Sequence, residues 1–110
     1  MTTSTNSSNT IADWLTAHEA ELISAADYIF CHPELAYQET LSAKYLSEYL
    51  ASQGFSVIAG TAGIDTAFTA RWGEGKPVLG FLAEYDALAK IGHACGHNLL
   101  EQQSAARRAP

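Results

Sequence analysis

The sequence predicts an α/β fold with a mixed sheet, in which two helices are followed by three strands, a loop rich in metal-ligand side chains and a last helix. Three observations carry this prediction. Apolar residues recur at helical spacing in the first half of the 110-residue chain. Short alternating or continuous apolar runs follow in the second half. The hydrophobic content of 47% fits a globular core.

The first helix is predicted over about residues 11–30. Residues 1–9 are rich in serine, threonine and asparagine, so we expect them to form a flexible leader. Thr10 and Asp13 have the spacing of a capping box, which predicts that the helix begins there. Pro33 ends the helix, since proline disfavours helical geometry at the residue before it. The apolar stripe of this helix comprises Ile11, Leu15, Leu22 and Ile29.

The second helix is predicted over about residues 39–53. Gly54 stands where a left-handed C-terminal cap belongs, because glycine adopts positive φ without steric cost. The side chains expected on the buried face are Leu41, Tyr45, Leu46, Tyr49 and Leu50.

Three strands are predicted after the helices. Residues 55–59 alternate between apolar and polar side chains, and residues 67–72 form another short strand after them. A glycine-rich turn at residues 73–76 leads into residues 77–83, which are almost continuously apolar. A run of this kind is typical of a strand buried on both faces, and we expect it to be the central strand of the sheet.

Composition excludes several functions. The chain has 12 acidic and 6 basic residues, which argues against a nucleic-acid partner. It contains no run of the roughly 20 apolar residues that a membrane span requires. The first ten residues lack the basic and apolar regions of a secretory signal, so we expect a cytoplasmic protein. In that compartment Cys31 and Cys95 are predicted to be free thiols or metal ligands.

The loop after residues 77–83 holds the residues suited to chemistry. It contains the carboxylates of Glu84 and Asp86, the imidazoles of His93 and His97, and the thiol of Cys95. Ligands bind beyond the carboxyl ends of strands in open α/β sheets, which favours a functional site here. Thiolate and imidazole are preferred ligands of zinc and related ions, so the loop predicts a metal site.

Spacing leaves the choice of ligands open. His93, Cys95 and His97 occupy alternate positions, and an extended chain would direct all three to one side. A helix that began near Gly96 would break this alignment, and only some of the three would converge. Glu84 and Asp86 share the alternation, so either acid would orient a ligand imidazole or bind the ion directly. Two alternatives are an incidental pattern and Cys95 as an active-site nucleophile.

Four ordered motifs resemble a known family. The sequence is similar at residues 32–39, 63–68, 75–88 and 92–98 to the aminoacylase/carboxypeptidase-type metallopeptidases. The nearest branch is that of N-acyl-amino-acid amidohydrolases and aminobenzoyl-glutamate hydrolases. The last of the four motifs is the most specific. The resemblance implies that residues 10–98 form the N-terminal part of a metallopeptidase catalytic domain.

The resemblance also implies a site and an activity. Cys95 and His97 would be ligands in a centre of two divalent metal ions, zinc or manganese, with His93 and Glu84 as less favoured ligands. Asp86 would be an acid that supports the metal site. The motif at residues 32–39 would shape the turn and the start of the second helix. The substrates would be N-acyl amino acids or dipeptides, hydrolysed at the amide bond, and full-length relatives would form homo-oligomers.

Two departures from the family pattern affect this expectation. The family's general base is a glutamate in a Glu-Glu pair downstream of the Cys-x-His motif, and this sequence contains no such pair. Residues 99–110 also differ from the apolar helix that the family pattern requires. We therefore expect a truncated chain that is inactive alone. The alternatives are a non-catalytic metal-binding module and a non-functional truncated remnant.

Overall fold

A computed structural model describes the backbone of residues 3–99 and the side chains of residues 9–99. Its mixed α/β character confirms the predicted fold class. The elements, in chain order, are helix α1 (Thr3–Cys31), helix α2 (Thr40–Ser52), strand β1 (Ser56–Ala59), the short 3-10 helix η1 (Thr61–Gly63) and strand β2 (Phe68–Arg71). A last helical turn begins at His97. The expected tail at residues 99–110 lies, after Leu99, outside the described residues.

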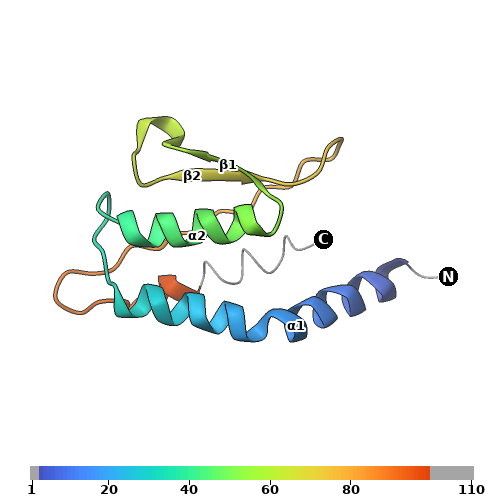
Figure 1. Cartoon of the computed structure of the whole chain (residues 1–110), viewed down its shortest axis with the longest axis horizontal. Coiled ribbons are helices and arrows are strands. Elements are labelled where there is room, and N and C mark those ends of the chain that lie inside the picture. Colours follow the sequence, from blue (N-terminus) through green and yellow to red (C-terminus); the bar gives the residue numbers. More distant parts are fainter. Residues whose placement is uncertain (1–2, 100–110) are drawn as a thin grey trace.

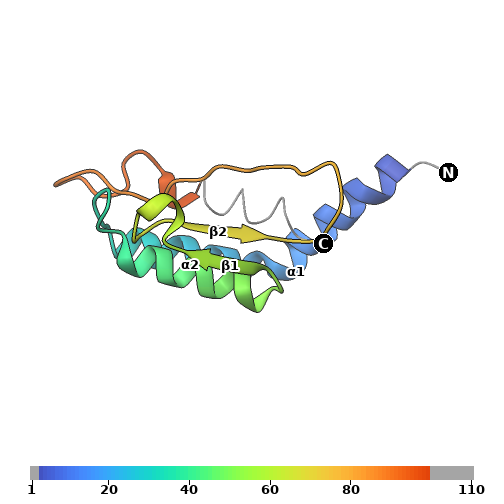
Figure 2. The ribbon, with the colours of Figure 1, turned by 90° about the horizontal axis from the view of Figure 1, so that it is seen from above.

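Helix α2 lies between α1 and a two-stranded sheet (Figure 1). Strands β1 and β2 are antiparallel, with Ser56 opposite Arg71 and Ala59 opposite Phe68. After β2 the chain turns and runs back along the sheet, as Figure 2 shows from above. This return brings residues 84–88 to the end of α1 that leads into α2, where the site is built.

Helix α1 is longer than the sequence predicted. It begins at Thr3, eight residues before the predicted start, and its helical backbone is continuous through Thr10, so Thr10 does not cap a first turn. The flexible leader expected at residues 1–9 stays a prediction. Among the side chains described, from residue 9 on, burial is confined to the second half of the helix, where Ile29 is fully buried, whereas Ile11 is 45% exposed. The first half of α1 projects beyond α2 (Figure 1), and no other helix or strand of the described part of the chain covers the stripe there.

Helix α2 agrees with the prediction within one residue at each end. Its C-terminus has the Schellman pattern, because the N–H of Gly54 donates to the carbonyl of Ala51 and the N–H of Phe55 donates to that of Leu50. Gly54 has a φ of +97°, and a Cβ atom there would lie 2.6 Å from the Trp72 ring. Both facts require glycine at this position.

The core consists of two clusters that share Phe68. One contains Leu50, Phe55 and Ala70 between α2 and the sheet, and the other contains Ile29, Leu46 and Tyr85 between the two helices and the returning chain. Burial of each large aliphatic side chain contributes about 1.5–3 kcal/mol. The second cluster matters most for function, since Tyr85 lies between the two acidic residues of the candidate site.

The predicted strand at residues 77–83 is wrong. The structure assigns no strand there, and the side chains of Val78, Leu79 and Leu82 are 69, 75 and 99% exposed. An apolar run is held as a buried strand only where neighbouring strands pair with it and other layers cover both of its faces. In residues 3–99 the sheet has only β1 and β2, and nothing covers these three side chains.

Within residues 3–99, no helix has both the length and the apolar character that crossing a bilayer demands.

Candidate metal centre

The segment Glu84–Ala87 presents its acidic side chains on one face. Tyr85 and Ala87 are buried at 9% and 6% exposure, while Glu84 is exposed and Asp86 is half-buried. This alternation follows from extended backbone, in which successive side chains point to opposite sides. The Tyr85 hydroxyl donates to the carbonyl of Thr66 and so ties the buried side of the segment to the chain before β2. Packing of Tyr85 and Ala87 therefore directs both carboxylates away from the core.

His97 reaches the same place from the last helical turn. Gly96, with a φ of +72°, makes the turn that leads into it. The next residue, Asn98, is buried, and its side-chain amide donates to the carbonyl of Ala26 in α1 at 3.3 Å. This hydrogen bond fixes the turn against α1. Asn98 was not predicted to be an anchor, because nothing in the sequence places its amide against α1.

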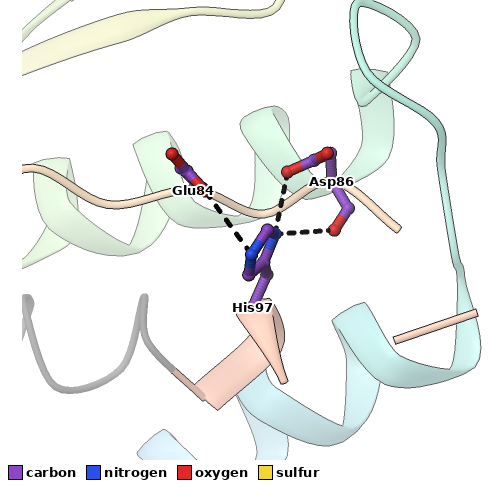
Figure 3. A network of polar contacts seen from close by, with 3 residues as sticks. All are labelled: Glu84, Asp86 and His97. Carbon is purple, nitrogen blue, oxygen red and sulfur yellow. Dashed lines mark hydrogen bonds and ion pairs between the residues drawn. The ribbon is translucent and has the colours of Figure 1, made fainter. Parts of the chain in front are cut away.

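The His97 ring lies between the two carboxylates (Figure 3). Its Nδ1 atom is 2.8 Å from Oδ1 of Asp86 and 3.1 Å from the backbone carbonyl oxygen of Asp86. Both partners are acceptors, so Nδ1 carries the proton and donates it. The other ring nitrogen, Nε2, is 3.4 Å from Oε2 of Glu84. Asp86 thus selects the tautomer that leaves the Nε2 lone pair free for a cation.

The spacing of the donor atoms fits a divalent metal ion. Two ligands about 2.1 Å from one ion at the tetrahedral angle lie roughly 3.4 Å apart, which matches the Nε2–Oε2 distance. The ligand atoms of Glu84, Asp86 and His97 all lie within 4.8 Å of one another. The Glu84 side chain is 71% exposed, so the site opens to solvent on this side. Imidazole and carboxylate together suit zinc, manganese or a related ion.

Cys95 and His93 lie outside this cluster. The last helix begins at His97, which breaks the alternation of the three residues, as anticipated for a helix that starts near Gly96. The Cys95 thiol is free and exposed. The structure therefore groups His97 with Glu84 and Asp86, not with Cys95, and the roles of Cys95 and His93 as ligands stay predictions.

His93 is the buried histidine of the loop. Its side chain is 7% exposed, and neither ring nitrogen makes a hydrogen bond within the described residues. Burial lowers the pKa of His93 below its ordinary value, because charge is disfavoured away from water; the nearby Ile29 carbonyl opposes this lowering. The carbonyl lies outside hydrogen-bonding geometry. His93 is thus a neutral, packed side chain in this structure.

Comparison with known proteins finds three related hydrolases. The chain is 39% identical over 107 residues to a p-aminobenzoyl-glutamate hydrolase subunit of Escherichia coli (strain K12), a match that covers 82% of this chain and 22% of that protein. It is 37% identical over 91 residues to the Xaa-Arg dipeptidase of Homo sapiens, covering 71% of this chain and 21% of the dipeptidase. The Xaa-Arg dipeptidase of Mus musculus is 36% identical over 84 residues, covering 67% and 20%.

The chain spans about a fifth of the length of these curated relatives. No known protein-family profile matches it.

Proposed function

Because the chain belongs, over the part that matches, to the aminoacylase/carboxypeptidase-type metallopeptidase family, we propose that Glu84, Asp86 and His97 build part of a divalent-metal centre for amide hydrolysis. The observation that carries the proposal is the His97 imidazole, which is held through Nδ1 by Asp86 while its Nε2 faces Glu84 at 3.4 Å. A carboxylate–histidine pair of this kind orients a metal ligand and raises its basicity.

Each residue of the chain has a separate task in this proposal. His97 Nε2 and a Glu84 carboxylate oxygen would hold the ion. Asp86 would keep the proton on Nδ1 of His97 and the ring in place. A bound divalent ion would polarise an amide carbonyl and lower the pKa of water. The family resemblance adds Cys95 as a ligand, and the exposed loop that carries its thiol would have to move for Cys95 to join the site.

The substrates we propose are N-acyl amino acids or dipeptides. Support comes from the names of the relatives, a hydrolase of p-aminobenzoyl-glutamate and two dipeptidases. We expect the 110-residue chain alone to bind a metal ion without turning over substrate, because its described residues place two ligands, the acid that orients one of them, and no separate general base at the site. A homo-oligomer is the expected assembly for the whole protein.

A metal-binding measurement tests the proposal. Equilibrium dialysis against zinc and against manganese should load the wild-type chain, and the His97→Ala variant should lose most of this binding. His18→Ala is the matched control, because His18 stacks on Trp14 in α1, away from the site. Equal metal content in wild type and His97→Ala, with both chains folded, would refute the proposed centre.

A non-catalytic metal-binding module is the second candidate. It is favoured by the finding of only one group of possible ligand side chains among residues 9–99, since a catalyst of this family would need a second set. An assay of p-aminobenzoyl-glutamate and dipeptide hydrolysis by the metal-loaded chain bears on the choice between the two. Turnover that His97→Ala abolishes would rule out the non-catalytic module, whereas metal binding without turnover is expected of the 110-residue chain under either candidate.

We also propose a cytoplasmic location. Cys31 and Cys95 are both free and exposed, and such thiols persist most readily in a reducing compartment. Cell fractionation with thiol labelling tests this, and recovery of both cysteines in oxidised form from an exported fraction would contradict it.

A further inference from the structure

Glu34 caps the N-terminus of α2 from outside the helix. The residue in the cap position, Glu39, makes no side-chain cap hydrogen bond. Instead the Glu34 carboxylate accepts from the N–H of Leu41 at 3.0 Å, the N–H of Ser42 at 2.8 Å and the hydroxyl of Thr40 at 3.1 Å. The two N–H groups belong to the first turn of α2, where the helix itself supplies no acceptors. The positive end of the helix dipole adds to their attraction for a carboxylate. The side chain of Glu34 is thereby fixed at both oxygens.

The backbone of the same residue holds the acidic segment of the site. The Glu34 carbonyl accepts from the N–H of Ala87 at 2.7 Å. Ala87 directly follows Asp86, whose side chain selects the His97 tautomer. One residue before Glu34, the Pro33 ring packs close to Gly92, at 3.9 Å from where a Cβ would lie there. The turn between α1 and α2, which contains Pro33 and Glu34, thus contacts the site loop before and after the bend at which Leu88 and Gly92 pair.

This turn is also anchored to both helices. His32 stacks on Tyr28 of α1 with ring centroids 4.3 Å apart, and its Nδ1 is 2.7 Å from the Tyr28 carbonyl. Tyr28 also stacks on Tyr45 of α2 at 4.5 Å. The turn is therefore held to α1 through His32 and to α2 through the Glu34 carboxylate, and the Glu34 carbonyl links it to the extended segment that contains Asp86.

We propose that Glu34 is a positioning residue. Its carboxylate caps α2 and so fixes its own backbone carbonyl, which accepts from the N–H of Ala87 and keeps Asp86 within hydrogen-bonding distance of His97. The importance of this for metal binding rests on the proposed function; the positioning itself does not. Replacing the carboxylate by an amide in Glu34→Gln would set an NH2 group against N–H donors of α2, and the turn would relax.

The test reads the His97 tautomer in the metal-free full chain. Nitrogen-15 NMR of the imidazole rings distinguishes a protonated Nδ1 from a protonated Nε2. In wild type His97 should carry the proton on Nδ1. Asp86→Asn and Glu34→Gln should both shift the ring signals toward the Nε2-protonated form, and Glu34→Gln should add little in the Asp86→Asn background. Glu48→Gln, an exposed glutamate on α2, is the control and should leave the signals unchanged.

Thr40→Val keeps the proposal falsifiable if Glu34→Gln fails to fold. It removes only one hydrogen bond to the Glu34 carboxylate and should shift the His97 signals in the same direction by a smaller amount. An unchanged His97 tautomer in folded Glu34→Gln, or in Thr40→Val where Glu34→Gln does not fold, would overturn the proposal. Because no metal is present, that result is independent of the metal-binding test, which alone decides the proposed function.

Discussion

At the scale of single residues, His97 is the side chain on which the site depends. Each nitrogen of its ring lies beside one carboxylate, and the two carboxylates belong to residues two positions apart in an extended segment. The His97 and Asp86 side chains are 20% and 30% exposed, so solvent screens part of their interaction and its contribution to stability is small. The arrangement matters through chemistry instead, because it fixes which nitrogen is available to an ion.

The two possible ligand sets give opposite predictions for variants of Glu84 and Cys95. If the arrangement of Figure 3 persists when metal binds, Glu84→Gln should weaken zinc affinity by roughly tenfold or more, and Cys95→Ser should change it little. Isothermal titration calorimetry of the two variants measures this, with Cys31→Ser as the control for loss of a thiol. A large loss in Cys95→Ser with normal binding in Glu84→Gln would instead support the ligand set that the family resemblance implies.

At the scale of elements, α2 is fixed at both ends by residues outside it. Glu34 supplies acceptors for its first N–H groups, and Gly54 closes its last turn in a left-handed conformation. Between these two caps, α2 contributes Leu50 to one core cluster and Leu46 to the other. We therefore regard α2 as the element on which the site loop and the sheet are both positioned.

The Glu34 cap predicts an acid-dependent loss of stability. Burial raises the pKa of Glu34, but the hydrogen bonds from the N–H groups of Leu41 and Ser42 lower it more, to below its ordinary value of 4.5. The unfolded chain therefore binds a proton first as the pH falls. The stabilisation is complete above a pH of about 4.5 and is lost as the pH falls through the lower, folded-state pKa.

Glu34→Gln should accordingly lower the free energy of unfolding by about 1 kcal/mol at neutral pH, as for loss of a helix cap. The difference from wild type should shrink as the pH falls below 4.5. Urea unfolding at a series of pH values checks both expectations. A difference that is constant over this range would show that the charged carboxylate is not what stabilises α2, and Glu48→Gln should show neither effect.

At the scale of the whole molecule, the apolar segment at residues 77–83 is the feature that the described structure leaves uncovered. Val78 and Leu79 are 69% and 75% exposed on consecutive positions, beside a sheet of only two strands. Adjacent exposed apolar side chains near a sheet edge favour association between chains.

The double variant Val78→Lys/Leu79→Lys should therefore reduce self-association without a loss of stability. Sedimentation velocity over a range of protein concentrations measures the association, and circular dichroism checks the fold. The reason is that neither side chain contributes to the core clusters, so the substitution removes exposed apolar area at no cost in packing. Association that persists unchanged in the variant would place the contact elsewhere, and a Lys76→Glu variant controls for altered charge in this segment.

Local sequence signals predicted most of the fold, because they act over a few residues. Glycine at position 54 and the apolar spacing of α2 each specify a local conformation, and β1 and β2 follow from short alternating runs. The signals failed where the outcome depends on distant partners. Residues 77–83 have the composition of a central strand, but the described structure places no strands on either side of them.

The candidate site was likewise predicted in part, where the signal was local. The loop was predicted to carry the metal ligands, and His97 and both acids do converge there. Which side chains meet depends on where the last helix begins and on the packing of Tyr85 and Asn98, and neither is encoded in the spacing of the ligand residues themselves.

The most direct test of the proposed metal centre is zinc K-edge X-ray absorption on the zinc-loaded chain, beside the Glu84→Gln variant. We predict histidine nitrogen and carboxylate oxygen at about 2.0–2.2 Å in wild type, with loss of one oxygen scatterer in the variant. An additional sulfur at about 2.3 Å would add Cys95 to the same centre. A shell without histidine, identical in wild type and variant, would contradict the proposed centre.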